Sequence, residues 1–271
     1  MNRKAIAVVI VLMWIGGFAW MLRRNYGGDV NRRLTEAAIR IQPASFYYSL
    51  TFRGQKIGAA SSVLDTLVAA FVSEDYYTGR FPSGDSLIDV SARLRTRLSR
   101  GFRATDVSMY LTRAGKTSKL GGFVQNDSTL VVVDGRSADS ATPHLAALSS
   151  PMIPPGLIGV ALLAGDQPKV GRTERFVVFN PISAKPERRE IRVAAESLFT
   201  VIDSAGQTRS GEWLAAHSDT VRAWRLEGDA SGLRIWIDAE GRVVEAGAPN
   251  GLLLRRTAFE LAFDRAQPGA R

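Results

Sequence analysis

Serine and histidine are the residues of this sequence whose types could support nucleophilic catalysis. Ser86 stands in the string Gly84-Asp85-Ser86-Leu87, and the chain contains only 2 histidines, His144 and His217. A serine becomes a nucleophile when a histidine takes its proton and an acidic residue orients that histidine. The residues around the two histidines therefore decide whether a serine hydrolase is expected.

The string around Ser86 resembles the opening block of the GDSL hydrolases, which carry an Asp-x-x-His motif near the C-terminus. Here Leu214 stands three positions before His217, and Ala141 three positions before His144, so neither histidine completes that motif. The residues directly ahead of the string, Phe81-Pro82-Ser83, do not have the pattern of an apolar strand either. We expect a protein without catalytic activity, and a serine hydrolase that uses Ser86 is the alternative.

The sequence predicts no metal and no cofactor. It contains no cysteine, which excludes disulfides, thiolate nucleophiles and sulfur-ligated zinc or iron–sulfur centres. Neither histidine has a further ligand at a local metal-binding spacing, and the glycine-rich strings that hold phosphates are missing. Asp65, Glu74 and Asp75 are acidic, but their order along the chain does not single out a pair of glycosidase carboxylates.

The net charge of +9 does not indicate a nucleic-acid-binding protein. Much of the excess flanks one apolar segment near the N-terminus, where basic residues are expected to face anionic headgroups. These residues are Arg3, Lys4, Arg23, Arg24, Arg32 and Arg33. The other basic residues are scattered singly, without the interleaved aromatics of a nucleic-acid site, and we expect no nucleic-acid partner.

The segment Ala5–Leu22 is predicted to anchor the chain in a membrane. It contains no charged residue, and its length just reaches the roughly 20 residues that a helix needs to cross the hydrocarbon core. Trp14 and Trp20 are suited to the interface. The alternative is a cleaved export signal, with Gly17 and Ala19 at the cleavage site. We favour the uncleaved anchor because apolar residues continue past that position.

The two signals for membrane orientation disagree. Counting basic residues near the helix ends slightly favours a cytoplasmic C-terminal side. A short basic start followed at once by an apolar run is, however, how exported bacterial proteins begin, and long domains translocate largely regardless of charge. We therefore expect a single-pass protein of the cytoplasmic membrane, with its domain on the periplasmic side as part of the cell envelope.

From Phe46 onward the pattern favours β-strands. Residues 46–52 are rich in aromatic and β-favouring residues, with Tyr48, Leu50 and Phe52 alternating with Ser49 and Thr51. A turn over Arg53–Lys56 leads to a second apolar run, and together these features predict a hairpin. Further strand-like runs follow, separated by clusters of Gly, Ser, Asp and Asn. The repeated Asp-x-x-Gly strings at Asp203–Gly206 and Asp238–Gly241 are typical of hairpin turns. This series indicates an antiparallel meander.

Two features of the β region leave alternatives open. The apolar run Leu157–Leu163 is too short to span a bilayer. It predicts a buried helix packed on the sheet or, alternatively, a lid that covers an apolar cavity. Trp236 alternates onto the same face as Arg234 and Asp238. That position suits a ring packed under a neighbouring element or a platform for a ligand.

Two hairpin-like stretches resemble a known exported β domain. They are residues 48–58, which read YSLTFRGQKIG, and residues 236–244, which read WIDAEGRVV and are followed by Arg255-Arg256-Thr257-Ala258. The domain that they resemble is often found ahead of bacterial transglutaminase-like catalytic domains. The chain ends where the catalytic Cys-His-Asp domain would begin and contains no Cys, so the resemblance implies an accessory β domain. A looser likeness, in architecture only, is to half-barrel lipoprotein carriers.

The sequence thus predicts a mainly β fold, an antiparallel meander, curved sheet or half-barrel with one or two short packing helices, preceded by a single transmembrane helix. We expect an anchor with a juxtamembrane helix at 1–45, a β domain at 46–266 and a disordered tail at 267–271. The predicted function is that of a binding or assembly module, with an envelope protein as partner, or a carrier of a lipid or other apolar ligand. Candidate ligand-binding residues are Leu157, Val160, Leu162, Leu163 and Trp236.

Overall fold

The computed structural model describes most of the β region of the chain. The described residues are 38, 41–83, 86–135, 143–163, 166–228, 232 and 234–264. The predicted anchor, including Ala5, Trp14, Trp20 and Leu22, and the tail at 267–271 lie outside these residues. Within them, no helix combines the length and the apolar character that crossing a membrane requires.

The described residues form mostly strands. The first half of the chain contains β1 (Ala44–Phe52), β2 (Gln55–Thr66), β3 (Ala70–Ser83), β4 (Ser86–Ser99), β5 (Ala104–Arg113), β6 (Lys116–Gln125), β7 (Thr129–Asp134) and β8 (His144–Ala147). The second half contains β9 (Met152–Ile153), the 3-10 turn η1 (Pro155–Leu157), α3 (Ile158–Leu163), β10 (Thr173–Asn180), β11 (Lys185–Gln207), β12 (Trp213–Gly228), β13 (Arg234–Ile237), β14 (Val243–Gly247), β15 (Leu252–Thr257) and α4 (Phe259–Phe263). The predicted mainly β architecture with few short helices is confirmed.

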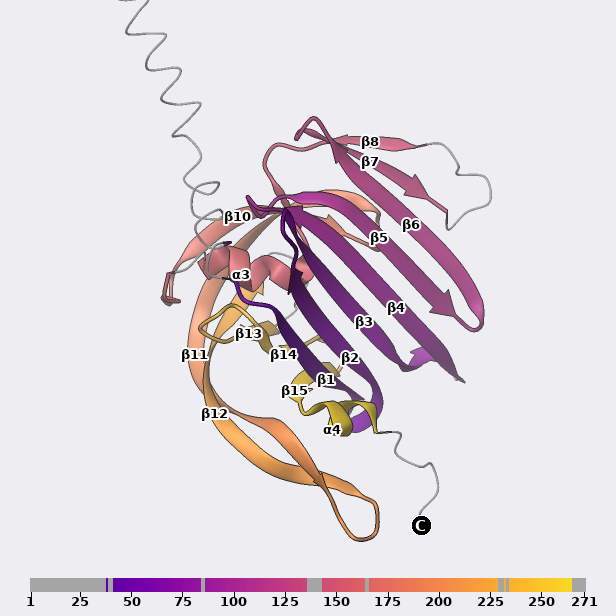
Figure 1. The fold of residues 1–271 in the computed structure, drawn as a ribbon, viewed down its shortest axis with the longest axis vertical. Helices are drawn as coiled ribbons and strands as arrows, with labels where there is room; N and C mark the ends of the chain where they lie inside the picture. The colour runs from indigo at the N-terminus through magenta and orange to yellow at the C-terminus, as the bar shows by residue number, and fades with distance from the viewer. Residues whose placement is uncertain are drawn as a thin grey trace, which may run out of the picture.

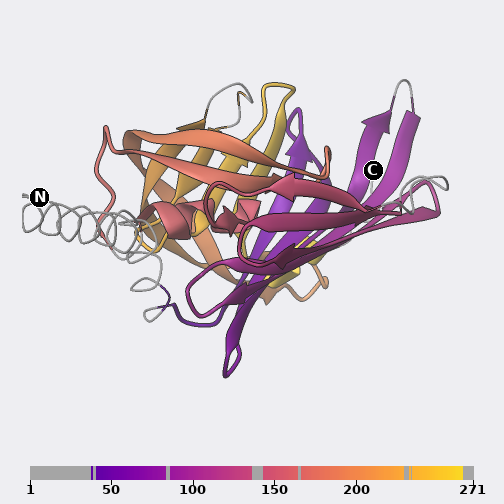
Figure 2. The same cartoon turned by 90° about the horizontal axis from the view of Figure 1, so that it is seen from above.

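All strands belong to one curved 15-stranded sheet in the order β8-β7-β6-β5-β4-β3-β2-β1-β15-β14-β13-β12-β11-β10-β9. Sequence neighbours pair antiparallel throughout the meander, and the last strand, β15, pairs antiparallel with the first, β1. Among the strands of the described residues, only the short β9 runs parallel to its neighbour, β10. The two edges, β8 and β9, follow each other directly in the chain, so the sheet curls round like an open barrel (Figures 1 and 2).

The first hairpin forms as its residue types predict. Arg53 and Gly54 both have positive φ, 50° and 83°, which a tight turn between β1 and β2 requires and which glycine adopts without steric cost. Phe71, Ser73 and Asp75 on β3 are buried, whereas the residues between them are more exposed. This alternation places one face of the sheet toward the interior.

The helix α3 lies between the two halves of the sheet and fills one end of the interior (Figure 2). Its side chains belong to the same core cluster as Phe71 and Leu98 from the first half and Phe176, Val193 and Trp224 from the second half. Close approach to the turn after β13 depends on glycine, since a Cβ on Gly159 would stand 2.3 Å from the carbonyl oxygen of Gly241. The interpretation of residues 157–163 as a buried helix is therefore confirmed.

One turn prediction is wrong. Asp203–Gly206 lies inside β11, and the hairpin turn falls later, where Gly211 N–H donates to the carbonyl of Thr208. Shifts in the β11–β12 register on both sides of Ser204 indicate that the extra residues are absorbed as bulges rather than as a turn. The second string, Asp238–Gly241, is a turn, with Gly241 at φ 80°.

Candidate functional site

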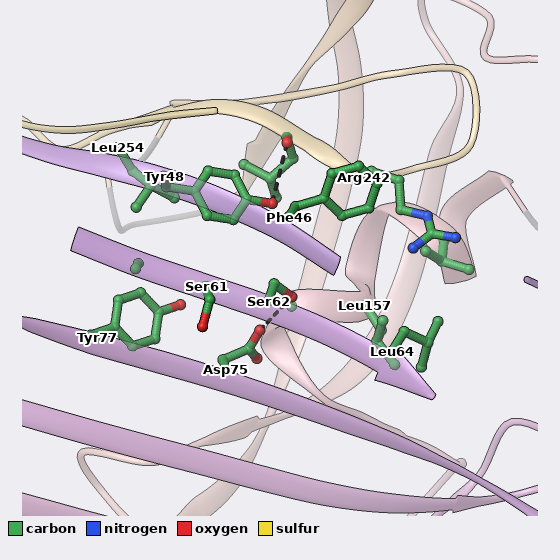
Figure 3. A pocket seen from close by; sticks show the side chains of 14 residues that line it. Phe46, Tyr48, Ser61, Ser62, Leu64, Asp75, Tyr77, Leu157, Arg242 and Leu254 are labelled. Atoms are coloured by element: carbon green, nitrogen blue, oxygen red, sulfur yellow. Dashed lines mark hydrogen bonds between the residues drawn. The ribbon is translucent and has the colours of Figure 1, made fainter. Parts of the chain in front are cut away.

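A small cavity of about 50 Å³ lies inside the sheet, next to η1. Its walls include Tyr48 from β1, Ser62 from β2, Asp75 and Tyr77 from β3, and Arg242 (Figure 3). The strand register brings the first four together, because Tyr48 pairs with Ala60, and Ser62 pairs with Asp75. The residues thus occupy adjacent rows on the inner face of three neighbouring strands.

Asp75 is the buried carboxylate of this cavity. It is 4 % exposed and accepts a hydrogen bond of 2.6 Å from the Ser62 hydroxyl. Burial raises the pKa of Asp75 to about 6, although the Ser62 hydrogen bond acts in the opposite direction, and the nearby charge of Glu74 raises it further. Gly156 leaves room for the carboxylate, because a Cβ there would stand 2.7 Å from Oδ2 of Asp75.

Two arginines stand near the opposite wall of the cavity. The guanidinium groups of Arg242 and Arg256 lie over the ring of Phe46 at 5.2 and 5.0 Å from its centroid. Arg256 forms a buried ion pair of 2.8 Å with Asp238, and Arg242 donates to the carbonyl of Gln42 at 3.2 Å. Burial also raises the pKa of the Tyr48 hydroxyl, which is therefore a neutral donor at physiological pH.

The size and composition of this cavity limit what it can do. A volume of about 50 Å³ holds only a few water molecules, since each needs roughly 10–15 Å³ by this measure. Ser62 donates directly to Asp75, and the two histidines of the sequence lie on other strands, β8 and β12. The cluster thus lacks the imidazole that activates a serine in a hydrolase.

A larger hollow lies on the outer face of the sheet, across β3 to β7. It encloses about 720 Å³, and its apolar wall includes Leu67, Val72, Phe123 and Val133. Phe123 is 47 % exposed. Gly121 opens the floor, because a Cβ there would meet no atom within 4 Å. We call this hollow the outer groove.

The charged side chains of the outer groove are mostly basic. Arg95, Arg97 and Lys119 line it, with Asp106 as its acidic residue. Neither arginine side chain has an ion-pair partner in the part of the chain that the structure describes. Lys119 instead lies over the Tyr110 ring at 5.5 Å from its centroid. Apolar walls beside convergent cations, in the 300–1,000 Å³ range of ligand pockets, suit an amphipathic anion.

The helix residues named as ligand contacts are placed in the core. Leu157, Val160, Leu162 and Leu163 are all buried, and the cavity that Leu157 and Val160 line is the small one beside Asp75. A ligand larger than a few water molecules would require α3 to move away from both halves of the sheet. The role of these four helix residues in ligand binding stays a prediction.

Trp236 is half-buried and packs against another aromatic side chain. Its ring centroid lies 4.9 Å from that of Phe199 on β11, and the Arg225 guanidinium lies 5.8 Å from it. It forms part of a satellite cluster with Val201, Ala223 and Val244. The arrangement agrees with packing against a neighbouring element.

Ser86 begins β4 and pairs with Ser83 across the β3–β4 hairpin. The rest of its motif, Gly84 and Asp85, lies outside the described residues. His144 and His217 belong to β8 and β12, which lie in different halves of the strand order.

The outer groove was not predicted from the sequence, although one feature of the sequence indicated a basic surface. Arg93, Arg95 and Arg97 alternate with buried residues along β4, which is the period of a strand with one basic face. The groove itself could not be recognised, because its other wall comes from β6 and β7, whose pairing the sequence does not state.

Comparisons with known proteins add similarity of shape alone. No protein-family model matches the chain, and no curated protein sequence matches it. A beta-barrel-like protein of the domain of unknown function DUF1849 from Brucella abortus aligns with 79 % of this chain and 95 % of its own, at 10 % identity and a TM-score of 0.48. A DUF1089 family protein from Pseudomonas aeruginosa aligns with 68 % of this chain and 87 % of its own, at 10 % identity and a TM-score of 0.37.

Proposed function

We propose that this chain is a non-catalytic binding module whose ligand is an anionic lipid, held in the outer groove. The observation that carries the proposal is the placement of Arg95, Arg97 and Lys119 beside the exposed apolar side chains of Phe123 and Val133 around about 720 Å³. An anionic headgroup can accept charge-assisted hydrogen bonds from the guanidinium groups. The acyl chain would cover apolar surface that is otherwise in contact with water.

The unpaired state of the two groove arginines supports this assignment. Elsewhere on the sheet, exposed arginines are commonly neutralised across strands, as Arg93 is by Glu74 at 2.8 Å and Arg255 by Glu245 at 2.8 Å. Arg95 and Arg97 stand on the same strand as Arg93 and lie opposite Glu74 and Asp106 in the strand register, but neither forms an ion pair with a residue that the structure describes. Their charges are therefore available to a ligand.

The cellular setting is part of the same proposal. With Ala5–Leu22 as an uncleaved anchor, the β domain would stand at the periplasmic surface of the cytoplasmic membrane and work beside a lipid surface. The accessory role implied by the resemblance to the domain ahead of transglutaminase-like enzymes is compatible with this setting, because it needs no catalytic residue in the β domain. An envelope protein could then receive or present the bound lipid.

Binding by the full chain, held in phosphatidylcholine nanodiscs, tests the proposal. We expect water-soluble dihexanoylphosphatidylglycerol to bind with 1:1 stoichiometry in calorimetry, and dihexanoylphosphatidylcholine and inorganic phosphate to bind much more weakly. The double variant Arg95→Gln/Arg97→Gln should weaken phosphatidylglycerol binding at least ~10-fold, because it removes two charge-assisted hydrogen bonds.

A matched control separates the groove from net charge. The double variant Arg188→Gln/Arg209→Gln removes the same charge from exposed positions outside the groove and should bind like the parent chain. Equal affinity for the anionic and zwitterionic lipids, or an equal loss in both double variants, would overturn the assignment of the groove.

A further inference from the structure

The long hairpin of β11 and β12 carries a group of potential metal ligands that its strand register brings together. Asp203 on β11 and His217 and Asp219 on β12 each offer one ligand atom, and these atoms all lie within 4.8 Å of one another. Asp203 is 14 positions away from His217 in the sequence, so linear spacing does not reveal the group.

The bulges in the hairpin explain how three such side chains reach one place. Ile202 pairs with Ser218 and Ser204 with His217, and the register shifts between these two pairs at Asp203. A bulge re-aims the side chain of the extra residue. The Asp-x-x-Gly string predicts that Asp203 starts a turn, whereas the structure makes it a bulged strand residue that lies beside His217 and Asp219.

The charge environment distinguishes these aspartates from the other acidic residues of the same two strands. Each glutamate of β11 and β12 is ion-paired with arginine: Glu187 with Arg189, Glu190 with Arg175, Glu196 with Arg222, and Glu227 with Arg192 and Arg225. Asp203 and Asp219 have no ion pair with any residue that the structure describes. The chain has 35 Lys and Arg against 26 Asp and Glu. Even so, the carboxylates of Asp203 and Asp219 lie beside a histidine and have no arginine or lysine to balance their negative charge among the described residues.

We infer that Asp203, His217 and Asp219 bind a divalent transition-metal ion, of which zinc is the representative. One imidazole nitrogen and two carboxylate oxygens form a mixed ligand set that zinc accepts, with the fourth position left to water. An all-oxygen preference makes calcium and magnesium poorer fits. The site is independent of the outer groove, and it would join β11 to β12 across the bulge without catalysing a reaction.

Zinc binding by the full chain, prepared without an affinity tag and freed of metal with a chelator, tests this site. We expect one zinc ion per chain by calorimetry. Loss of partners that merely orient ligands lowers metal affinity 10–100-fold, so His217→Gln and Asp203→Asn, which remove ligands, should each lower it by about 100-fold or more. His144→Gln, which alters the other histidine of the chain, should leave it unchanged.

The ligand set has its own readout. The X-ray absorption spectrum of the zinc-loaded chain should show one imidazole with oxygen donors, and His217→Gln should lose the imidazole signal. All four chains should retain the same far-ultraviolet circular dichroism, since these side chains are exposed. Absence of stoichiometric zinc binding, binding that survives both ligand substitutions, or calcium binding as tight as that of zinc would each overturn the proposal.

Discussion

Asp75 and Glu74 are adjacent acidic residues whose fates differ because a strand directs successive side chains to opposite faces. Glu74 faces outward and pairs with Arg93 at 2.8 Å. Asp75 faces inward, where it is 4 % exposed and its partner is the Ser62 hydroxyl. Both residues could be recognised as acidic candidates from the sequence. Which of them is buried could not be predicted, because two adjacent charged residues leave it ambiguous which strand positions face inward.

Burial of Asp75 makes stability depend on pH in a defined direction. Its pKa is raised to about 6, above the ~3.9 of an unfolded aspartate. The native chain therefore binds this proton more readily than the unfolded chain, and the contribution of Asp75 to stability falls as the pH rises from about 4 to above 6. Asp75→Asn removes this dependence while retaining a hydrogen-bonding side chain.

We expect the free energy of unfolding of Asp75→Asn minus that of the parent chain to be on the order of 3 kcal/mol larger at pH 7.5 than at pH 4, so the variant gains stability relative to the parent as the pH rises. Denaturant unfolding at both pH values measures this difference. Asp89→Asn, in an exposed pair with Arg80, should change it by less than about 1 kcal/mol. A difference that is the same at both pH values would contradict the burial argument.

Gly156 should be coupled energetically to Asp75. An alanine there would place its Cβ 2.7 Å from Oδ2 of Asp75, and the buried carboxylate is held by Ser62. We expect Gly156→Ala to destabilise the parent chain by about 1–3 kcal/mol, as overpacking commonly does, and to cost clearly less in an Asp75→Ala background. A double-mutant cycle of unfolding free energies measures the coupling, and strictly additive effects would exclude it.

At the scale of elements, the sequence predicted the strands better than their lengths and turns. Strong turn chemistry located the β1–β2 and β13–β14 hairpins. The string Asp203–Gly206 has equally good turn residues but lies within β11, because pairing with β12 continues past it through bulges. Tertiary pairing therefore overrode a local preference, and the ligand group on the hairpin was hidden for the same reason.

The helix α3 was predicted from its apolar run, but the contact that fixes its position was not. A Cβ on Gly159 would stand 2.3 Å from the Gly241 carbonyl oxygen, and neither backbone can move without disturbing the core. We expect Gly159→Ala to destabilise the chain by about 1–3 kcal/mol or more in thermal or denaturant unfolding. Gly206→Ala, whose Cβ would meet its nearest atom at 3.5 Å, should have little effect; comparable losses in both variants would refute this contact.

At the scale of the whole molecule, the meander could be predicted because each hairpin is local in sequence. The pairing of β1 with β15 could not, since it joins Tyr48 to Arg256 across nearly the entire domain and has no local signal. Curvature follows from that pairing together with the bulges. The small interior cavity and the outer groove depend on this curvature, and neither can be located from the sequence.

The joining of the two halves of the sheet by β15, which pairs with both β1 and β14, should be essential for folding. A chain that ends at Gly247 loses β15, its pairing with β1 and the Arg256–Asp238 ion pair of 2.8 Å. We expect it to be degraded by limited proteolysis and to lack a cooperative unfolding transition. A chain that ends at Asp264 keeps β15 and α4 and should resist proteolysis like the parent. A protease-resistant core in the shorter chain would show that the first half folds by itself.

The pairing of the first strand with the last also has a consequence for synthesis. The chain leaves the ribosome from its N-terminus, so β1 can pair with β2 early, but its other edge stays open until β15 has been made. An unpaired strand edge is a template for association with other chains, and incomplete chains with such edges are prone to aggregate. The domain therefore has most need of a chaperone in the interval between translation of β1 and translation of β15. Slower translation between these two strands should lengthen the time during which the chain depends on a chaperone.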